Sequence, residues 1–116
     1  MNEIRKLKVE SLLRSRLAGM ILYQEIKDPR VTTFLTVNSV SVSNDLSYAK
    51  VYIGSFQKDS TLGVAVEALN HAVGFIHGFL GKQLPLRNVP RLSFFVDNSV
   101  QAAMDLNRII DEANSH

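Results

Sequence analysis

The residue types in this chain that could bind a metal or act as nucleophiles do not form a recognisable catalytic set. His71 and His77 are six residues apart, which places them on different sides of a helix and makes them a poor metal-binding pair. We expect His71 at the surface and His77 at the surface or partly buried. Asp45 fits a turn and Asp97 a strand end or helix cap, and no base is placed to activate a serine. The sequence therefore predicts no catalytic residue, metal site or cofactor.

Two further classes of enzyme site are also absent from the sequence pattern. The 116 residues include no cysteine, which excludes disulfides, thiolate catalysis and cysteine zinc sites. Gly74, Gly78 and Gly81 lie within a helical pattern and do not follow a strand, unlike the glycines of Walker or Rossmann phosphate loops. We therefore expect a protein that is not an enzyme.

Basic residues are the remaining candidates for a functional surface. The net charge is only +2, but no acidic residue occurs between Glu67 and Asp97, and residues 1–30 are rich in lysine and arginine. This asymmetry predicts two basic surfaces that could contact phosphates, with ordinary solvated faces as the alternative. The residues expected to contact phosphates are Arg5, Lys6, Lys8, Arg14, Arg16, Lys50, Lys82, Arg87 and Arg91.

A long amphipathic helix is expected to carry the first basic group. Apolar residues recur at helical spacing over residues 3–26, and Asp28-Pro29 should end the helix because proline disfavours helical backbone in the residue before it. Gly19 within this helix suggests a place of close packing. The apolar stripe consists of Val9, Leu13, Leu17, Met20 and Ile21.

Three strands are expected after this helix. The alternation in "FLTVNSVSVS" slips by one residue, which predicts a bulge near Asn38-Ser39. Asn44-Asp45 predicts the turn of a hairpin whose return strand covers residues 46–56. After an irregular connection between Pro85 and Pro90, "LSFFVD" predicts a third strand. Asn98 or Ser99 should then cap a short last helix.

Between the second and third strands, residues 61–81 show one helical stripe, with Ser60 or Thr61 as cap and Gly81 as C-terminal glycine. Gly74 interrupts this stripe at a cost of about 1 kcal/mol relative to alanine. Close packing of the helix on the sheet would explain the glycine. A kink would explain it too, and the new helix N-terminus would then expose N–H groups that favour a phosphate.

The predicted order is α-β-β-α-(kink)-α-β with a short C-terminal helix, in an α+β fold whose three-stranded sheet is covered by helices. This order resembles the type II KH domain, in which a Gly-x-x-Gly loop joins the paired helices. Here Ala72-Val73-Gly74 stands instead, as in the bacterial ribosome-binding factor A family. "EIKDPR", "VSVSNDLSYAKVYIG" and "GFIHGFLGKQLPLRNVPRLSFFVDNS" are also similar to that family.

The resemblance covers nearly the whole chain and implies a single KH-like domain over residues 1–116. It implies a non-enzymatic assembly factor that binds the immature small ribosomal subunit and its RNA, assists late maturation of that RNA and supports growth in the cold. The family usually has arginine where this chain has His77, so His77 joins the expected RNA-binding residues and its charge would depend on pH. Arg91 replaces a smaller or acidic residue and would restore positive charge.

Two other functions remain open at this stage. The chain could be a KH-like module for single-stranded RNA outside the ribosome, or a protein–protein docking module without RNA. Residues 68–81 lack charged side chains but are shorter than the roughly 20 residues needed to cross a bilayer. We therefore expect no membrane association, a cytoplasmic location and a monomer.

Overall fold

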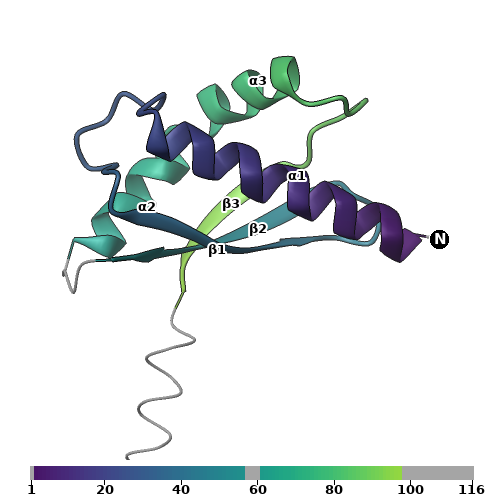
Figure 1. The fold of residues 1–116 in the computed structure, drawn as a ribbon, viewed down its shortest axis with the longest axis horizontal. Coiled ribbons are helices and arrows are strands. Elements are labelled where there is room, and N and C mark those ends of the chain that lie inside the picture. Colours follow the sequence, from purple (N-terminus) through teal and green to yellow (C-terminus); the bar gives the residue numbers. More distant parts are fainter. Residues whose placement is uncertain (1, 57–60, 98–116) are drawn as a thin grey trace, which may run out of the picture.

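The computed structural model describes residues 2–56 and 61–97, and the type II KH-like α+β fold expected from the sequence is confirmed (Figure 1). The expected last helix, with its Asn98 or Ser99 cap, and the alternative cap Ser60 lie outside these residues. The elements are α1 (Asn2–Leu22), β1 (Leu35–Val42), β2 (Tyr48–Ser55), α2 (Leu62–His71), α3 (Val73–Gln83) and β3 (Arg91–Val96).

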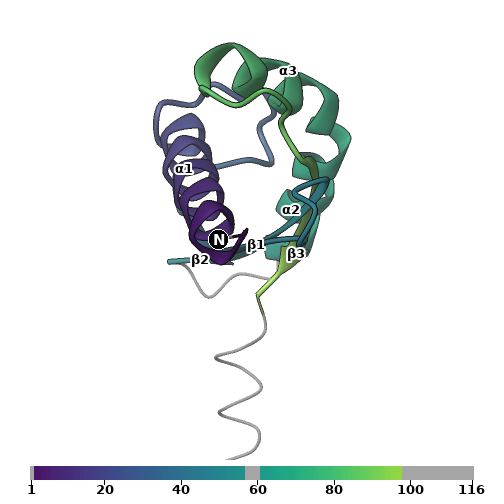
Figure 2. The ribbon, with the colours of Figure 1, turned by 90° about the vertical axis from the view of Figure 1, so that its right-hand side faces the viewer.

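The sheet has the order β1-β2-β3, with β1 and β2 antiparallel and β2 and β3 parallel. A parallel neighbour requires a crossover, and α2 and α3 together form it. The described helices lie on one side of the sheet in both views (Figures 1 and 2). The result is a two-layer domain with a helix-covered face and an open face.

The core lies between these layers, and its composition confirms the expected stripes. All five apolar residues of the α1 stripe are buried, as are Leu69 on α2 and both Ile76 and Leu80 on α3. On β2, alternation places Ala49, Val51 and Ile53 against the helices. Apolar burial of this kind is the main stabilising term of the fold.

The first helix ends earlier than predicted, at Leu22 rather than near residue 26. Gln24 has a φ of 55°, in the left-handed region, and follows the helix as its C′ residue. The Glu25 N–H donates to the Met20 carbonyl at 2.9 Å and the Gln24 N–H to the Ile21 carbonyl at 3.2 Å. This Schellman pattern satisfies the last carbonyls, so the chain turns before Pro29 can act as the stop.

The bulge and the hairpin both form where the alternation predicted them. Pairing slips between Val37 and Ser39, and the opposite strand carries Gly54. A Cβ on Gly54 would lie 2.6 Å from Asn38 Nδ2, so a larger residue there would displace the Asn38 side chain from its hydrogen bond to Asp97. At the hairpin, the Leu46 N–H donates to the Ser43 carbonyl at 2.9 Å, which closes a turn around Asn44 and Asp45. The return strand begins at Tyr48 and not at residue 46 as predicted, so the connection between β1 and β2 is longer than a two-residue turn.

Helix side chains contact the outer edge of both edge strands. Glu10 on α1 accepts the Val42 N–H at 2.7 Å. Asn70 on α2 binds the Phe94 backbone twice, donating to the carbonyl and accepting from the N–H, each at 2.9 Å. These bonds pair β1 and β3 backbone groups that face away from β2.

Two expectations about glycine were wrong. A Cβ on Gly19 would meet nothing within 4 Å, so no described group packs closely against it. Gly81 does not end its helix, because α3 continues to Gln83 and its C-cap is Leu84.

Within residues 2–56 and 61–97, no helix is long and apolar enough to cross a membrane.

Candidate nucleic-acid interface

The interruption between α2 and α3 lies at Ala72, two residues before the glycine that predicted it. Ala72 has φ −90° and ψ 7°, and its N–H is shared between the carbonyls of Ala68 and Leu69 at 3.0 and 3.1 Å. Helix α3 begins at Val73, and the Ile76 N–H already donates to Ala72. The predicted kink is therefore present and centred on Ala72.

The structure does not show why a glycine would be needed at position 74. We expected either a backbone conformation that L-residues avoid or a neighbour too close for a Cβ. No glycine in the described part of the chain has a positive φ, and a Cβ on Gly74 would meet nothing within 4 Å. The expectation was wrong because the break is made by the Ala72 backbone, and Gly74 lies in the first regular turn of α3.

Gly74 instead lines an open hollow of about 320 Å³ at the break. The His77 ring binds the Val89 carbonyl through Nε2 at 2.9 Å. Because a carbonyl only accepts, this nitrogen carries the proton in the neutral ring and Nδ1 remains available to a partner. The hollow is lined by Val73, Gly74, His77, Arg91 and Leu92.

Replacing Gly74 with alanine should separate stability from binding. We expect Gly74→Ala to raise the free energy of unfolding by up to about 1 kcal/mol, because alanine is the better helix former and the site has space. The same methyl group enters the hollow, so affinity for a ligand seated there should fall. Thermal melting and RNA-binding assays on one preparation measure both. A less stable variant would contradict the open geometry.

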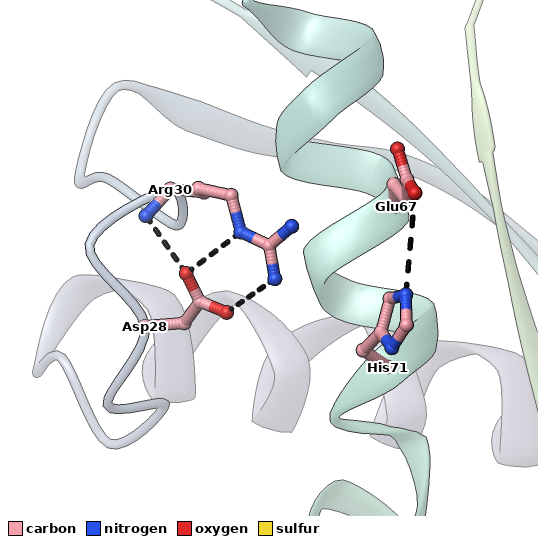
Figure 3. A network of polar contacts seen from close by, with 4 residues as sticks. All are labelled: Asp28, Arg30, Glu67 and His71. Carbon is pink, nitrogen blue, oxygen red and sulfur yellow. Dashed lines mark hydrogen bonds and ion pairs between the residues drawn. The ribbon is translucent and has the colours of Figure 1, made fainter.

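On the other side of the break, the loop after α1 is held by an ion pair. Arg30 donates to Asp28 through Nε at 3.1 Å, through Nη2 at 2.9 Å and through its backbone N–H at 2.9 Å. Figure 3 shows the Arg30 side chain extending toward α2, where His71 and Glu67 lie 4.0 Å apart. From the sequence we predicted only that this segment ends the helix. The ion pair could have been suspected, because Asp28 and Arg30 are two residues apart.

Two carboxylates have lowered pKa values, which lead to a prediction about the pH dependence of stability. Hydrogen bonds from Arg30 lower the pKa of Asp28 from 3.8 to about 2, and those from Ser47 and Ser43 do the same for the pKa of Asp45. A lowered folded-state pKa stabilises the fold above the unfolded value, and this stabilisation disappears as pH falls through about 2. We expect the stability difference between wild type and Asp28→Asn/Asp45→Asn to shrink between pH 4 and 2 in denaturant titrations. A constant difference would contradict the assignment.

The two basic regions of the sequence meet at one end of the molecule. Arg5 on α1 and Arg87 in the loop before β3 line one hollow of about 240 Å³, together with Asp45. Next to it, Lys6 Nζ donates to Asn44 Oδ1 at 3.4 Å. The Arg5–Arg87 pair could hold a phosphate, and Asp45 in the same hollow opposes this.

The other predicted contacts are spread over the surface. Arg14 Nε donates to the Val37 carbonyl at the bulge, 3.3 Å away, so it also supports the sheet edge. Arg16 lines a groove between α1 and α3, and Lys50 lies on the open face of the sheet. Lys8 and Lys82 are exposed on α1 and α3. The structure therefore groups Arg5 with Arg87 and places Lys6 beside them, and it groups Arg91 with His77 at the hollow and with Lys50 on the sheet.

A metal centre has no candidate ligands in the described part of the chain. Residues 2–56 and 61–97 contain no group of three histidine, cysteine, aspartate or glutamate side chains that could hold an ion. Basic side chains line both the hollow at the break and the Arg5–Arg87 hollow.

Comparison with known proteins decides the family. The family model described as "Ribosome-binding factor A" matches residues 5–110. The chain belongs to the ribosome-binding factor A family. The Treponema pallidum ribosome-binding factor A is 42% identical over 118 residues, covering 99% of this chain and 94% of that protein. The protein from Borrelia garinii subsp. bavariensis is 40% identical over 112 residues, with 97% and 93% covered.

Solved structures of the family share the fold. The crystal structure of ribosome-binding factor A from Thermus thermophilus superposes with a TM-score of 0.66 at 33% identity, covering 78% of this chain and 94% of that one. A homology model of the factor from the same organism, fitted into the cryo-EM map of a 30S–RbfA complex, gives 0.63 at 32% identity, with 78% and 93% covered.

The two departures from the family pattern are now neighbours. His77 and Arg91 line the same hollow, although they come from α3 and from the start of β3. The proximity that the sequence alone left open is therefore present.

Proposed function

We propose that this protein is an assembly factor that binds the immature small ribosomal subunit and its RNA. Membership of the ribosome-binding factor A family over residues 5–110 carries this proposal. The relative that was fitted into a 30S–RbfA map supplies the partner. The hollow at the Ala72 break, with His77 and Arg91, is the proposed RNA contact, and the Arg5–Arg87 hollow is a second one.

The proposal extends to the late maturation of the subunit's RNA and to growth in the cold, as a non-enzymatic, cytoplasmic, monomeric protein. Described side chains that share one hydrophobic core support a single domain over residues 1–116. Binding would combine phosphate contacts from the basic residues with recognition of RNA shape. The lack of a catalytic constellation in the sequence supports a binding role.

Sedimentation tests this function directly. Purified protein is mixed with free small subunits or with complete ribosomes, and each mixture is centrifuged through a sucrose cushion. We expect the protein to pellet with free small subunits and to remain in the supernatant with complete ribosomes. Equal recovery with both particles, or with neither, would contradict an assembly factor. Retention on small-subunit RNA that weakens as salt rises would distinguish RNA binding from a protein–protein module, which would not be retained.

A further inference from the structure

The face of the sheet opposite the helices carries side chains that no described helix covers. We call it the open face. Because side chains alternate along a strand, residues between the core positions point to this side. The described helices pack on the other side (Figure 2). The open face includes Ser39, Ser41, Tyr48, Lys50, Tyr52, Arg91, Ser93 and Phe95, and Thr36, Asn38 and Asp97 lie on the same side at one end of it.

Aromatic rings are the first notable feature of the open face. The ring centroids of Tyr52 and Phe95 lie 5.8 Å apart at 32°, so these side chains form one aromatic surface across β2 and β3. Tyr48 is 59% exposed and Phe95 is 42% exposed. Tyr48 and Tyr52 are four residues apart, about 13 Å along the strand. Exposed rings on a rigid sheet offer flat surfaces for stacking.

Positive charge is the second feature. Lys50 lies between the two tyrosines on β2, and Arg91 pairs with Tyr48 across to β3. Asp97, one residue beyond β3 and on the same side as Phe95 by alternation, is the acidic residue of this face, and it accepts a hydrogen bond from Asn38 at 2.7 Å. Exposed cations among rings fit an anionic partner that has flat groups of its own.

We propose that the open face binds single-stranded RNA, with unpaired bases stacked on Tyr48, Tyr52 and Phe95 and phosphates on Lys50 and Arg91. Bases stack on aromatic side chains only when they are not paired in a duplex. Hydroxyls of Ser39, Ser41 and Ser93 can bind the ribose 2′-OH, which distinguishes RNA from DNA. This proposal rests on the proposed function and adds a second RNA surface to it.

The open face is continuous with the hollow at the Ala72 break. Arg91 starts β3, lines that hollow and pairs with Tyr48 in the sheet. Arg91 is therefore shared by the two surfaces, and one RNA strand could contact both of them at this residue. This continuity favours RNA over an unrelated partner at the open face.

Tyrosine fluorescence locates the ligand, because the chain has three tyrosines and no tryptophan. A Tyr23→Phe variant leaves Tyr48 and Tyr52 as the emitting residues. We expect a single-stranded octauridine RNA to quench this emission, and an eight-base-pair RNA duplex to leave it nearly unchanged. Equal quenching by the duplex would overturn the proposal. A response to RNA-free small-subunit proteins but not to octauridine would overturn it in favour of a protein partner.

Paired substitutions test stacking itself, with anisotropy of end-labelled octauridine as the readout. Tyr48→Leu/Tyr52→Leu should weaken binding by about 5- to 150-fold for each of the two stacked bases that is lost. Tyr48→Phe/Tyr52→Phe is the matched control and should bind nearly as the wild type does, since it keeps both rings. Equal affinities of the leucine and phenylalanine variants would overturn the proposal. Melting temperatures confirm that both variants are folded.

The same preparations are sedimented with free small subunits. Wild-type protein that pellets with subunits but does not bind octauridine would overturn the open-face proposal and leave the proposed function intact. Wild-type protein that binds octauridine but does not pellet with subunits would support the open face and contradict the assembly function. The two proposals therefore fail in different measurements.

Discussion

Leu69→Ala is expected to lower the free energy of unfolding by about 2 to 5 kcal/mol, the usual cost of a cavity at a fully buried leucine. Leu69 is 0% exposed and lies on α2, which packs against β2 and β3 three residues before the Ala72 break. The loss would remove much of the roughly 5 to 15 kcal/mol that typically stabilises a domain. Urea denaturation followed by circular dichroism measures it.

Val64→Ala on the same helix is the matched control. Val64 is 45% exposed, so its truncation opens no cavity. We expect a change within about 0.5 kcal/mol, since alanine also favours the helix. Similar losses for both variants would mean that α2 does not pack through Leu69 as described.

Arg5→Gln/Arg87→Gln should have a large effect on binding to small-subunit RNA. If both guanidinium groups contact phosphates, each contributes roughly 0.7 to 0.9 to the slope of log affinity against log salt. The double variant should therefore flatten the slope by about 1.4 to 1.8 and weaken binding about 25- to 60-fold at 0.1 M salt. Filter binding to small-subunit RNA over a salt series measures both quantities.

Lys27→Gln/Lys58→Gln removes the same charge from two positions outside the proposed set. This control should change the slope by much less than the arginine pair, because only phosphate contacts release counterions at the interface. Equal slopes for the two double variants would mean that Arg5 and Arg87 affect binding only through the net charge of the protein and do not contact phosphates.

The elements of the fold were predictable because their signals are local. The α1 stripe, the alternation of Ala49, Val51 and Ile53, and the slip that marks the bulge all depend on neighbours in sequence. The end of α1 was not predictable in this way. Gln24 adopts a left-handed conformation that sequence reasoning assigns to glycine or asparagine, so Pro29 was taken as the stop.

The candidate site was predictable as a set of residues but not as an arrangement. Arg5 and Arg87 are far apart in the chain and meet only because the hairpin end and the loop before β3 lie beside α1. Gly74 indicated that the helix breaks, yet the break falls at Ala72. Glycine marks freedom of the backbone, and which nearby residue bends is decided by how two helices pack on one sheet.

The helix side chains on the sheet edges have a consequence for association between chains. An edge strand with free N–H and C=O groups is a template on which another chain can add a strand. Glu10 occupies the Val42 N–H, and Asn70 occupies both groups of Phe94. Protection against aggregation thus depends on α1 and α2 remaining folded. Fraying of either helix would leave a strand edge ready to pair with a second molecule while the sheet itself is still intact.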